Sequence, residues 1–156
     1  MRIGTVRGII TKEDKIAVIK RIRENEGKIR EYYVLPGGGV EENESFEIAM
    51  KREAKEELGV DINVKGTLYK FVNRGELNTF MLCEITNGDI GSGVGPEFTS
   101  EDYKKNGQYI PMLLTKEQIR DIDLVPNEIR DRILKDLKKA KTFKNLLKVN
   151  EIDQER

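Results

Sequence analysis

One stretch of the chain, residues 37–60, constrains the fold more than any other because it joins a glycine loop to a helix rich in glutamate. The strand-like run EYYVL at residues 31–35 precedes it and is interrupted by Pro36 and three glycines. A helical pattern follows from Ser45 to Leu58, and Gly59 is a typical residue to end such a helix. Its apolar side chains recur every four residues: Phe46, Met50, Ala54 and Leu58.

Three glutamates on this helix, Glu53, Glu56 and Glu57, fall within about one turn, so we expect their carboxylates to project toward the same volume. Like charges at this spacing destabilise a helix by roughly 0.2–0.5 kcal/mol per pair. The neighbouring lysines point elsewhere and Arg52 reaches only one side, so a hard divalent cation is the better partner. Mg²⁺ prefers oxygen ligands and suits a few carboxylates together with substrate phosphate oxygens, and Mn²⁺ also fits.

The glycines support the same interpretation, because a backbone without Cβ atoms can approach an ion or a phosphate closely. A glycine-rich turn or a glutamate-rich helix is, by itself, more often only structural. The two features together predict phosphate chemistry.

Composition limits the other possibilities. The 156 residues suit one compact domain, and the 28 basic and 28 acidic side chains give no net pull toward nucleic acid or a membrane. The absence of histidine removes the commonest general base, so acid-base and metal chemistry must use carboxylates. The single cysteine, Cys83, fits a reducing compartment, and we found no signal peptide or membrane span, so we expect a cytoplasmic protein.

Several further runs are rich in β-branched residues and predict strands. Residues 3–10 and 16–22 flank the turn-like TKED and predict a hairpin. Residues 60–72 and 79–85 are separated by a polar segment and are expected to pair, and residues 109–114 predict a short strand.

The later part of the chain predicts a long loop and two helices. Residues 87–108 are rich in Gly, Asp and Ser and are interpreted as a functional loop. Thr115 and Gln118 resemble a capping box, and Asn127 is expected to cap a helix that reaches about Lys139. We therefore expect one domain over residues 1–140. Residues 141–156 would form a lysine-rich tail that continues the last helix or is appended to it, with a solvated helix face favoured over an anion-binding surface.

The spacing inside residues 38–60 resembles the complete sequence box of the Nudix hydrolase family, MutT-like members included. Gly38 is followed after five residues by Glu44 and, after seven more, by the run REAKEELGV that begins at Arg52. The resemblance implies an α/β fold, an α/β/α sandwich around a mixed β-sheet with C-terminal helices. It also implies a loop, helix and loop that bind Mg²⁺ or Mn²⁺.

The resemblance also implies roles by position. Glu53, Glu56 and Glu57 would be the catalytic metal ligands, with Glu53 a candidate to activate water. The backbone carbonyl of Gly37 or Gly38 would complete the coordination. The supporting ion pair of the family matches two further positions: Glu44 and Arg52.

Outside the box, the family often takes one more catalytic carboxylate from a later loop. Glu97 in GVGPEF is our candidate, with Glu101 and Asp102 as competitors. Arg21 and Arg23 end the second predicted strand and are candidates for binding substrate phosphate, although solvated arginines are common there.

The function implied is metal-dependent hydrolysis of a phosphoanhydride bond in a nucleoside diphosphate derivative, a small-molecule nucleotide. We place first a MutT-like nucleoside triphosphate pyrophosphohydrolase, acting on ordinary or oxidised nucleotides. ADP-ribose or sugar-nucleotide hydrolysis is the alternative. A non-catalytic domain that senses nucleotides or binds RNA is a third hypothesis, which the intact acidic cluster disfavours. An isoprenoid diphosphate isomerase would need a reactive Cys83. Whether the chain is a monomer or a homodimer stays open.

Overall fold

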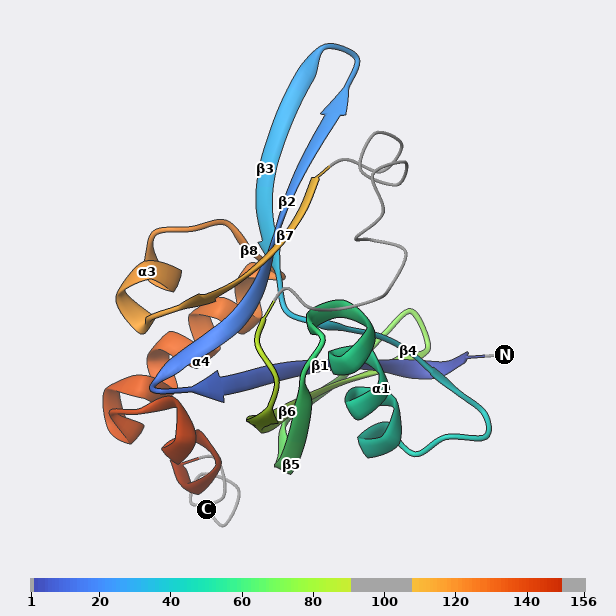
Figure 1. Ribbon diagram of the computed structural model, residues 1–156, viewed down its shortest axis with the longest axis vertical. Helices are drawn as coiled ribbons and strands as arrows, with labels where there is room; N and C mark the ends of the chain where they lie inside the picture. Colours follow the sequence, from blue (N-terminus) through green and yellow to red (C-terminus); the bar gives the residue numbers. More distant parts are fainter. Residues whose placement is uncertain (1, 91–107, 150–156) are drawn as a thin grey trace.

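The computed structural model describes residues 2–90 and 108–149. These residues form an eight-stranded mixed sheet with helices on both of its faces (Figure 1). The strands are β1 (Arg2–Lys12), β2 (Lys15–Asn25), β3 (Lys28–Val34), β4 (Gly37–Glu41), β5 (Asp61–Asn73), β6 (Glu76–Asn87), β7 (Gln108–Leu114) and β8 (Leu124–Val125). The helices are α1 (Phe46–Leu58), α3 (Lys116–Arg120) and α4 (Asn127–Ala140), and the short 3-10 helix η2 (Phe143–Asn145) follows them.

The first two strands diverge after a very short pairing. The hairpin predicted for residues 3–10 and 16–22 forms, but the two strands pair only next to the turn, at Thr11 with Ile16 and Lys12 with Lys15. The physical reason is that each strand has other partners: β1 pairs with β4 and, in parallel, with β6, whereas β2 pairs with β3 and β7. We call the place where β1 and β4 separate from β2 and β7 the fork.

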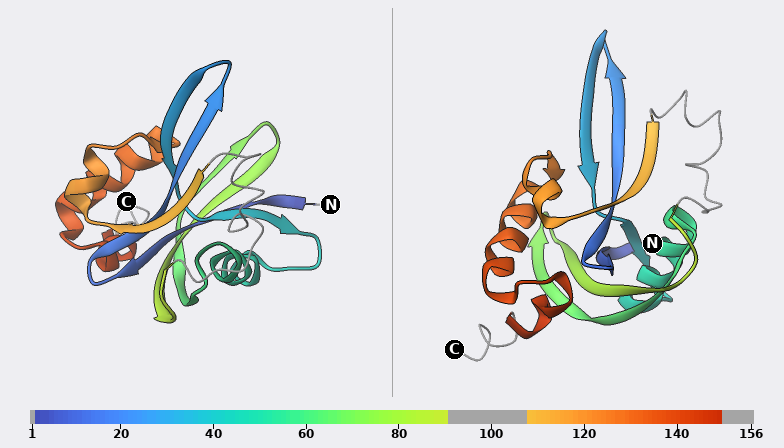
Figure 2. Two further views of the ribbon diagram at one scale, coloured as in Figure 1. Left: turned by 45° about the horizontal axis from the view of Figure 1, so that its top comes forward. Right: turned by 60° about the vertical axis from the view of Figure 1, so that its left-hand side comes forward.

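The two arms of the fork point in different directions. The β2–β3 hairpin, with β7 beside β2, projects away from the body of the protein, while β1 and β4 run past α1 (Figures 1 and 2). As predicted, β5 and β6 pair in antiparallel fashion at the opposite edge of the sheet.

The sheet separates two hydrophobic cores. Val6 and Ile10 of β1 pack with α1, whereas Ile9, between them in register, packs with α4 and the residues that follow it. This alternation is what a strand buried on both faces produces. The predicted α/β/α arrangement is thereby confirmed.

Helix α1 has well-defined ends. Its N-cap is Ser45, whose Oγ accepts a hydrogen bond from the backbone N–H of Ile48 at 3.1 Å. Gly59 ends the helix in the left-handed conformation with φ 76°, as its lack of a side chain allows. Met50, Ala54 and Leu58 are fully buried, so the four-residue stripe predicted from the sequence is the packed face.

The C-terminal helices agree with the sequence in part. Thr115 and Gln118 form the predicted capping box at α3. Pro126, however, takes the N-cap position of α4, and the side-chain amide of Asn127 instead donates to the carbonyl of Leu124 at 2.8 Å. The expectation that Asn127 caps the helix is therefore wrong.

Helix α4 is held to the sheet by a buried polar group as well as by apolar packing. The hydroxyl of Tyr69 in β5 donates to Oδ2 of Asp136 at 2.7 Å, and Nε of Arg132 lies 3.2 Å from the same oxygen. The Arg132 guanidinium also lies over the Tyr69 ring, 5.2 Å from its centre. Beyond α4, Phe143 and Leu146 are fully buried in the same core. Within the described ranges, every helix is too short or too polar to cross a membrane.

Candidate active site

Glu57 lies at the centre of the candidate site. Its side chain is only 4% exposed, and its Oε1 accepts a hydrogen bond from the backbone N–H of Gly37 at 2.7 Å. The Tyr109 hydroxyl, from β7 on the other arm of the fork, donates to Oε2. Burial raises the pKa of Glu57 to about 8, and the neighbouring charge of Glu53 adds to the rise, while the two donors oppose it.

Glu53 lies beside Glu57, one helical turn earlier. Burial also raises the pKa of Glu53, although Arg52 opposes the shift. Its carboxylate contacts the glycine loop so closely that a Cβ on Gly38 would lie 2.6 Å from Oε1 of Glu53. A side chain at position 38 would therefore displace the Glu53 carboxylate.

Arg52 connects the loop to the helix. Its Nε and Nη2 donate to the two carboxylate oxygens of Glu44 at 2.9 and 2.7 Å, and Nη2 also donates to the carbonyl of Gly39 at 3.1 Å. The pair lowers the pKa of Glu44 to about 2. Nη1 of Arg52 lies 3.0 Å from Oε1 of Glu53, so one guanidinium orients both the loop and the first of the buried glutamates.

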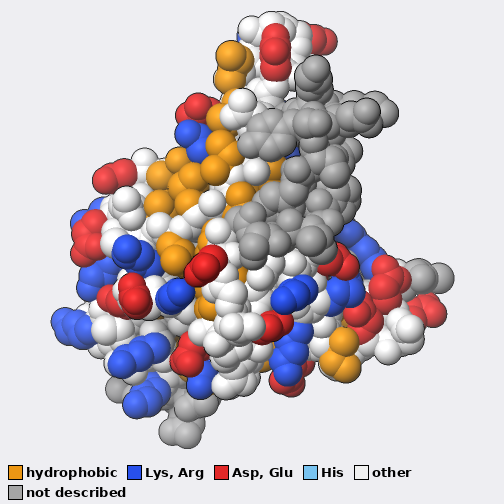
Figure 3. Space-filling model, in the orientation of Figure 1, with side chains coloured by type: hydrophobic (Ala, Val, Ile, Leu, Met, Phe, Trp, Pro, Cys, Tyr) orange, Lys and Arg blue, Asp and Glu red, His pale blue; other side chains and the backbone are white. Residues whose placement is uncertain are grey.

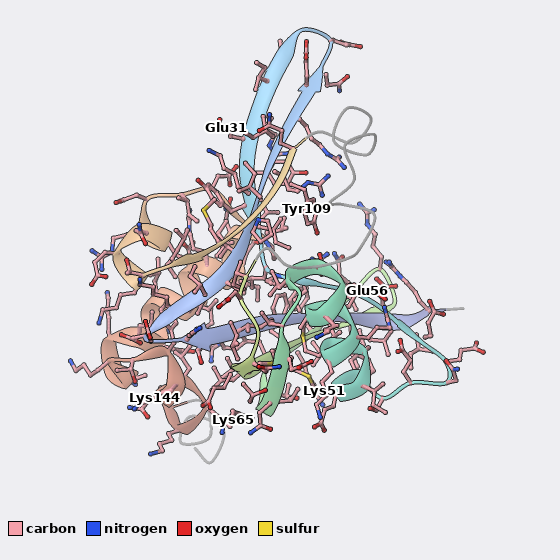
Figure 4. The ribbon with its side chains drawn as sticks, viewed as in Figure 1. Glu31, Lys51, Glu56, Lys65, Tyr109 and Lys144 are labelled. Carbon is pink, nitrogen blue, oxygen red and sulfur yellow. The ribbon has the colours of Figure 1, made fainter. Side chains whose placement is uncertain are left out.

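Of the three glutamates expected to share one volume, Glu53 and Glu57 lie against the glycine loop, whereas Glu56 lies at the surface but is close enough to raise the pKa of Glu53. Glu56 is about half exposed, and its Oε2 lies 3.5 Å from Nη1 of Arg52 (Figure 4). Over the described ranges, no three acidic or cysteine side chains are already arranged to hold a metal ion. Around the helix, Glu53 and Glu57 differ by about 40° and Glu56 lies about 60° to the other side of Glu53, so the three share the expected arc and differ in how far the loop covers them. Arg52 also reaches more of the cluster than expected.

Tyr109 is a site residue that the sequence analysis missed. It is the second residue of β7, and the pattern YIPMLL that it starts indicates only a strand. The guanidinium of Arg21 lies over the Tyr109 ring, 4.7 Å from its centre, so Tyr109 connects Arg21 to the cluster. Arg23 is exposed two residues farther along β2, opposite Arg30. Glu97, with its competitors Glu101 and Asp102, lies outside the described residues.

A pocket of about 560 Å³ opens on the α4 face of the sheet. The rings of Phe71 and Phe80 stack at its wall with their centres 5.7 Å apart. Arg7 lines the pocket and also lies within electrostatic reach of Glu57, whose pKa it lowers. The other side chains come from β1, β5, β6 and the start of α4: Thr5, Val72, Asn73, Asn78, Pro126, Glu128 and Ile129. The pocket therefore offers an aromatic wall with a few polar groups, and Arg7 connects it to the glutamate cluster.

Comparison with known proteins identifies the fold family. A model of the NUDIX domain matches residues 1–90, which include α1 and its glycine loop. An ADP-ribose pyrophosphatase of Methanocaldococcus jannaschii is 34% identical over 94 residues, or 56% of this chain and 54% of that protein. The chain thus spans about half the length of that curated relative.

Two solved structures show how far the fold is shared. MutT from Aliivibrio salmonicida and Vibrio cholerae aligns with a TM-score of 0.63 and 22% identity, over 85% of this chain and 96% of that one. An ADP-ribose pyrophosphatase of Streptococcus suis aligns with a TM-score of 0.54 and 19% identity, over 96% and 90% of the two chains. With the family model covering more than half of its residues, this chain belongs to the NUDIX domain family.

Proposed function

We propose that this protein is a divalent-metal-dependent pyrophosphatase that hydrolyses a phosphoanhydride bond in a nucleoside diphosphate derivative. The observation that carries the proposal is the pairing of Glu53 with Glu57. Two carboxylates lie together against a glycine loop, both with raised pKa values, beside a pocket with an aromatic wall. Such an arrangement needs a proton or a cation to neutralise it, which is typical of a functional site rather than of a structural one.

The residues present fit a hard cation. Glu53 and Glu57 would hold it from the centre, the carbonyl of Gly37 or Gly38 from the loop, and Glu56 from the rim once its carboxylate leaves Arg52. All of these donors are oxygens, which Mg²⁺ and Mn²⁺ prefer. When bound, the ion polarises a phosphoryl oxygen and offsets the charge of the diphosphate.

The chain's own groups then bind and orient the substrate. The nucleoside occupies the pocket with its base beside Phe71 and Phe80, and the diphosphate extends past Arg7 toward the glutamates. A water attacks one phosphorus in line, the new P–O bond forms as the bridging P–O bond breaks, and a carboxylate accepts the proton of the water. Glu53 is our candidate for that acceptor because it lies between the loop and the exposed rim.

ADP-ribose is the first substrate to test, because the relative with 34% identity is described as an ADP-ribose pyrophosphatase. Hydrolysis would give AMP and ribose 5-phosphate. The MutT-like alternative, a nucleoside triphosphate with an ordinary or oxidised base, would give a nucleoside monophosphate and pyrophosphate. The two activities use the same cluster and differ in what the open end of the pocket admits.

A substrate panel with the products quantified tests the proposal. ADP-ribose, a UDP-sugar, dGTP and its 8-oxo derivative are incubated with Mg²⁺, with Mn²⁺, and with a chelator. We expect turnover of at least one substrate with either ion, and none with the chelator. Failure to hydrolyse any of the four with both ions, by protein whose folding is verified by circular dichroism, would refute it.

The non-catalytic alternatives have weaker support. Figure 3 shows Lys and Arg side chains over α4 and the C-terminal segment interspersed with Asp and Glu, so this face is not a uniform basic patch for RNA. RNA binding that weakens steeply with salt, without turnover, would favour that alternative. An isomerase that needs a reactive thiol is disfavoured, because Cys83 is fully buried and burial raises its pKa to about 12.

A further inference from the structure

Arg7 stands between the pocket and the glutamate cluster. In strand β1 it alternates with Val6, which is buried in the α1 core, so Thr5 and Arg7 face the pocket. In the register of β1 with β4 it lies opposite Gly37, whose N–H donates to Glu57. Its position therefore connects the two parts of the site that a nucleoside diphosphate would occupy.

The Arg7 guanidinium is fixed in orientation but retains donors. Its Nη1 donates to the carbonyl of Leu35 at 2.9 Å, which anchors one side of the group. A guanidinium carries five N–H donors in a rigid fork that matches the oxygens of a phosphate. The Leu35 contact uses one of them, and the side chain is only half-buried. Glu128, the other charged side chain of the pocket lining, is an acceptor at the start of α4 and does not suit a phosphate.

A purely structural role would be to hold Leu35 and to offset the charge of Glu57. That role uses one donor of the guanidinium and does not explain why Arg7 also lines an aromatic pocket. Arg7 both lines the pocket and lies near Gly37 and Glu57, which favours a direct contact with substrate.

We infer that Arg7 binds the phosphate attached to the nucleoside and makes the pocket selective for phosphorylated nucleosides over free ones. The inference rests on the proposed function for the identity of the ligand. It adds a substrate-binding residue that lies outside the glycine loop and α1, and it assigns a chemical task to β1.

The test compares AMP with adenosine by calorimetry, with a chelator present so that no metal contributes. Wild-type protein should bind AMP at least tenfold more tightly than adenosine. Arg7→Gln should lose most of that preference while binding adenosine as before, because only the phosphate contact is removed. Lys12→Gln, which removes a positive charge from the far end of the same strand, should keep the preference and serves as the matched control.

Each other outcome has a definite meaning. An unchanged AMP preference in Arg7→Gln overturns the inference, as does an equal loss of AMP and adenosine binding, which indicates a structural role. Absence of AMP binding to the wild type also overturns it. If Arg7→Gln does not fold, Arg7→Lys replaces it: a lysine keeps the charge but loses the fork, so the preference should fall several-fold, and no fall overturns the inference.

The proposed function can fail separately. If the protein hydrolyses a substrate of the panel but its preference for AMP does not depend on Arg7, the proposed function holds and the role of Arg7 is refuted. If the preference for AMP depends on Arg7 but the protein hydrolyses none of the substrates, the role of Arg7 holds and the proposed function is refuted.

Discussion

Two acidic side chains in the described part of the chain are equally buried, yet their surroundings are opposite. Glu57 and Asp136 are each 4% exposed and each accepts a hydrogen bond from a tyrosine hydroxyl. Asp136 also has the guanidinium of Arg132 at 3.2 Å. Glu57 has another carboxylate, Glu53, as its neighbour instead.

The difference separates a structural carboxylate from a functional one. A buried charge paired with a cation of the same chain is complete, and its removal leaves its partners unsatisfied. A buried carboxylate placed beside a second one is only partly offset by Arg52 and Arg7, and a proton or an ion from solution would neutralise the remaining charge. Asp136 therefore has the surroundings of a structural carboxylate, whereas those of Glu57 fit the proposed active site.

The largest expected effect is on catalysis. Glu53→Gln keeps the shape of the side chain but removes its charge and its ability to accept a proton, so kcat on the substrate identified by the panel should fall about 10³-fold. The melting temperature should change little. Steady-state kinetics with saturating Mg²⁺ measure kcat, and thermal denaturation measures the melting temperature.

A matched control lies on the same helix. Glu47→Gln removes an exposed carboxylate that pairs only with Lys51, at 3.7 Å, and should leave kcat unchanged. Full activity in Glu53→Gln would show that the paired carboxylates are not the chemical centre.

The second-largest expected effect is on stability, and here a substitution of Asp136 should matter more than one of Glu57. Asp136→Ala should lower the free energy of unfolding by about 1–3 kcal/mol, because the buried Tyr69 hydroxyl and the Arg132 guanidinium lose their acceptor. Below the melting temperature kcat should be close to that of the wild type. Urea denaturation at pH 8 with a chelator gives the comparison, and Glu57→Gln measured in parallel should be as stable as the wild type or more stable. Loss of stability in both variants would erase the distinction.

A third prediction concerns pH. The pKa of Glu57 is raised in the folded protein to about 8, so the neutral form is the one that folding favours. The stabilisation is complete below the ordinary glutamate pKa of about 4.5 and is lost as pH rises through about 8. Metal-free protein should therefore melt at a lower temperature at pH 9 than at pH 6, relative to Glu57→Gln, which lacks this titration.

Magnesium should reverse that trend. Because the ion competes with protons for the carboxylates, the rise in melting temperature on adding Mg²⁺ should grow from pH 6 to pH 9. A pH-independent rise would contradict the placement of the ion at Glu57.

The smallest effect is expected from the contact across the fork. Tyr109→Phe removes the hydroxyl donor that opposes the rise in the Glu57 pKa, so that pKa should increase further. Mg²⁺ affinity at pH 7 should fall a few-fold and recover as the pH is raised. Calorimetric titration with Mg²⁺ at pH 7 and pH 9 measures this affinity. Tyr32→Phe, in the projecting hairpin, is the control and should bind Mg²⁺ as the wild type does. An equal loss at both pH values would indicate a structural role for Tyr109.

The sequence predicted the local elements of the site well. Ser45 and Gly59 define where α1 begins and ends, the four-residue stripe identifies its packed face, and the spacing of Gly38, Glu44 and Arg52 indicated the family. These features depend on interactions within about a dozen residues, which a single sequence displays directly.

The features that depend on tertiary contacts were not predictable in the same way. Nothing in the sequence shows that Tyr109 of β7 reaches Glu57, or that Tyr69 and Asp136 meet across 67 positions. The short pairing of β1 with β2 also depends on competing partners, since β4 and β6 occupy the edges of β1. The relative inaccessibility of Glu53 and Glu57, against the exposed Glu56, follows from where the loop packs.

The fixed ends of α1 have a consequence for how this region can change. With Ser45 anchoring one end and Gly59 the other, the rotational phase of the helix is set by the number of residues between them. One deleted residue before Glu57 would carry Glu57 to the exposed position of Glu56 and Leu58 to the position of Glu57, whereas one inserted residue would carry Glu57 into the buried position of Leu58. The outer surface of α1 can therefore accept substitutions, but the helix cannot gain or lose a residue without disrupting the site.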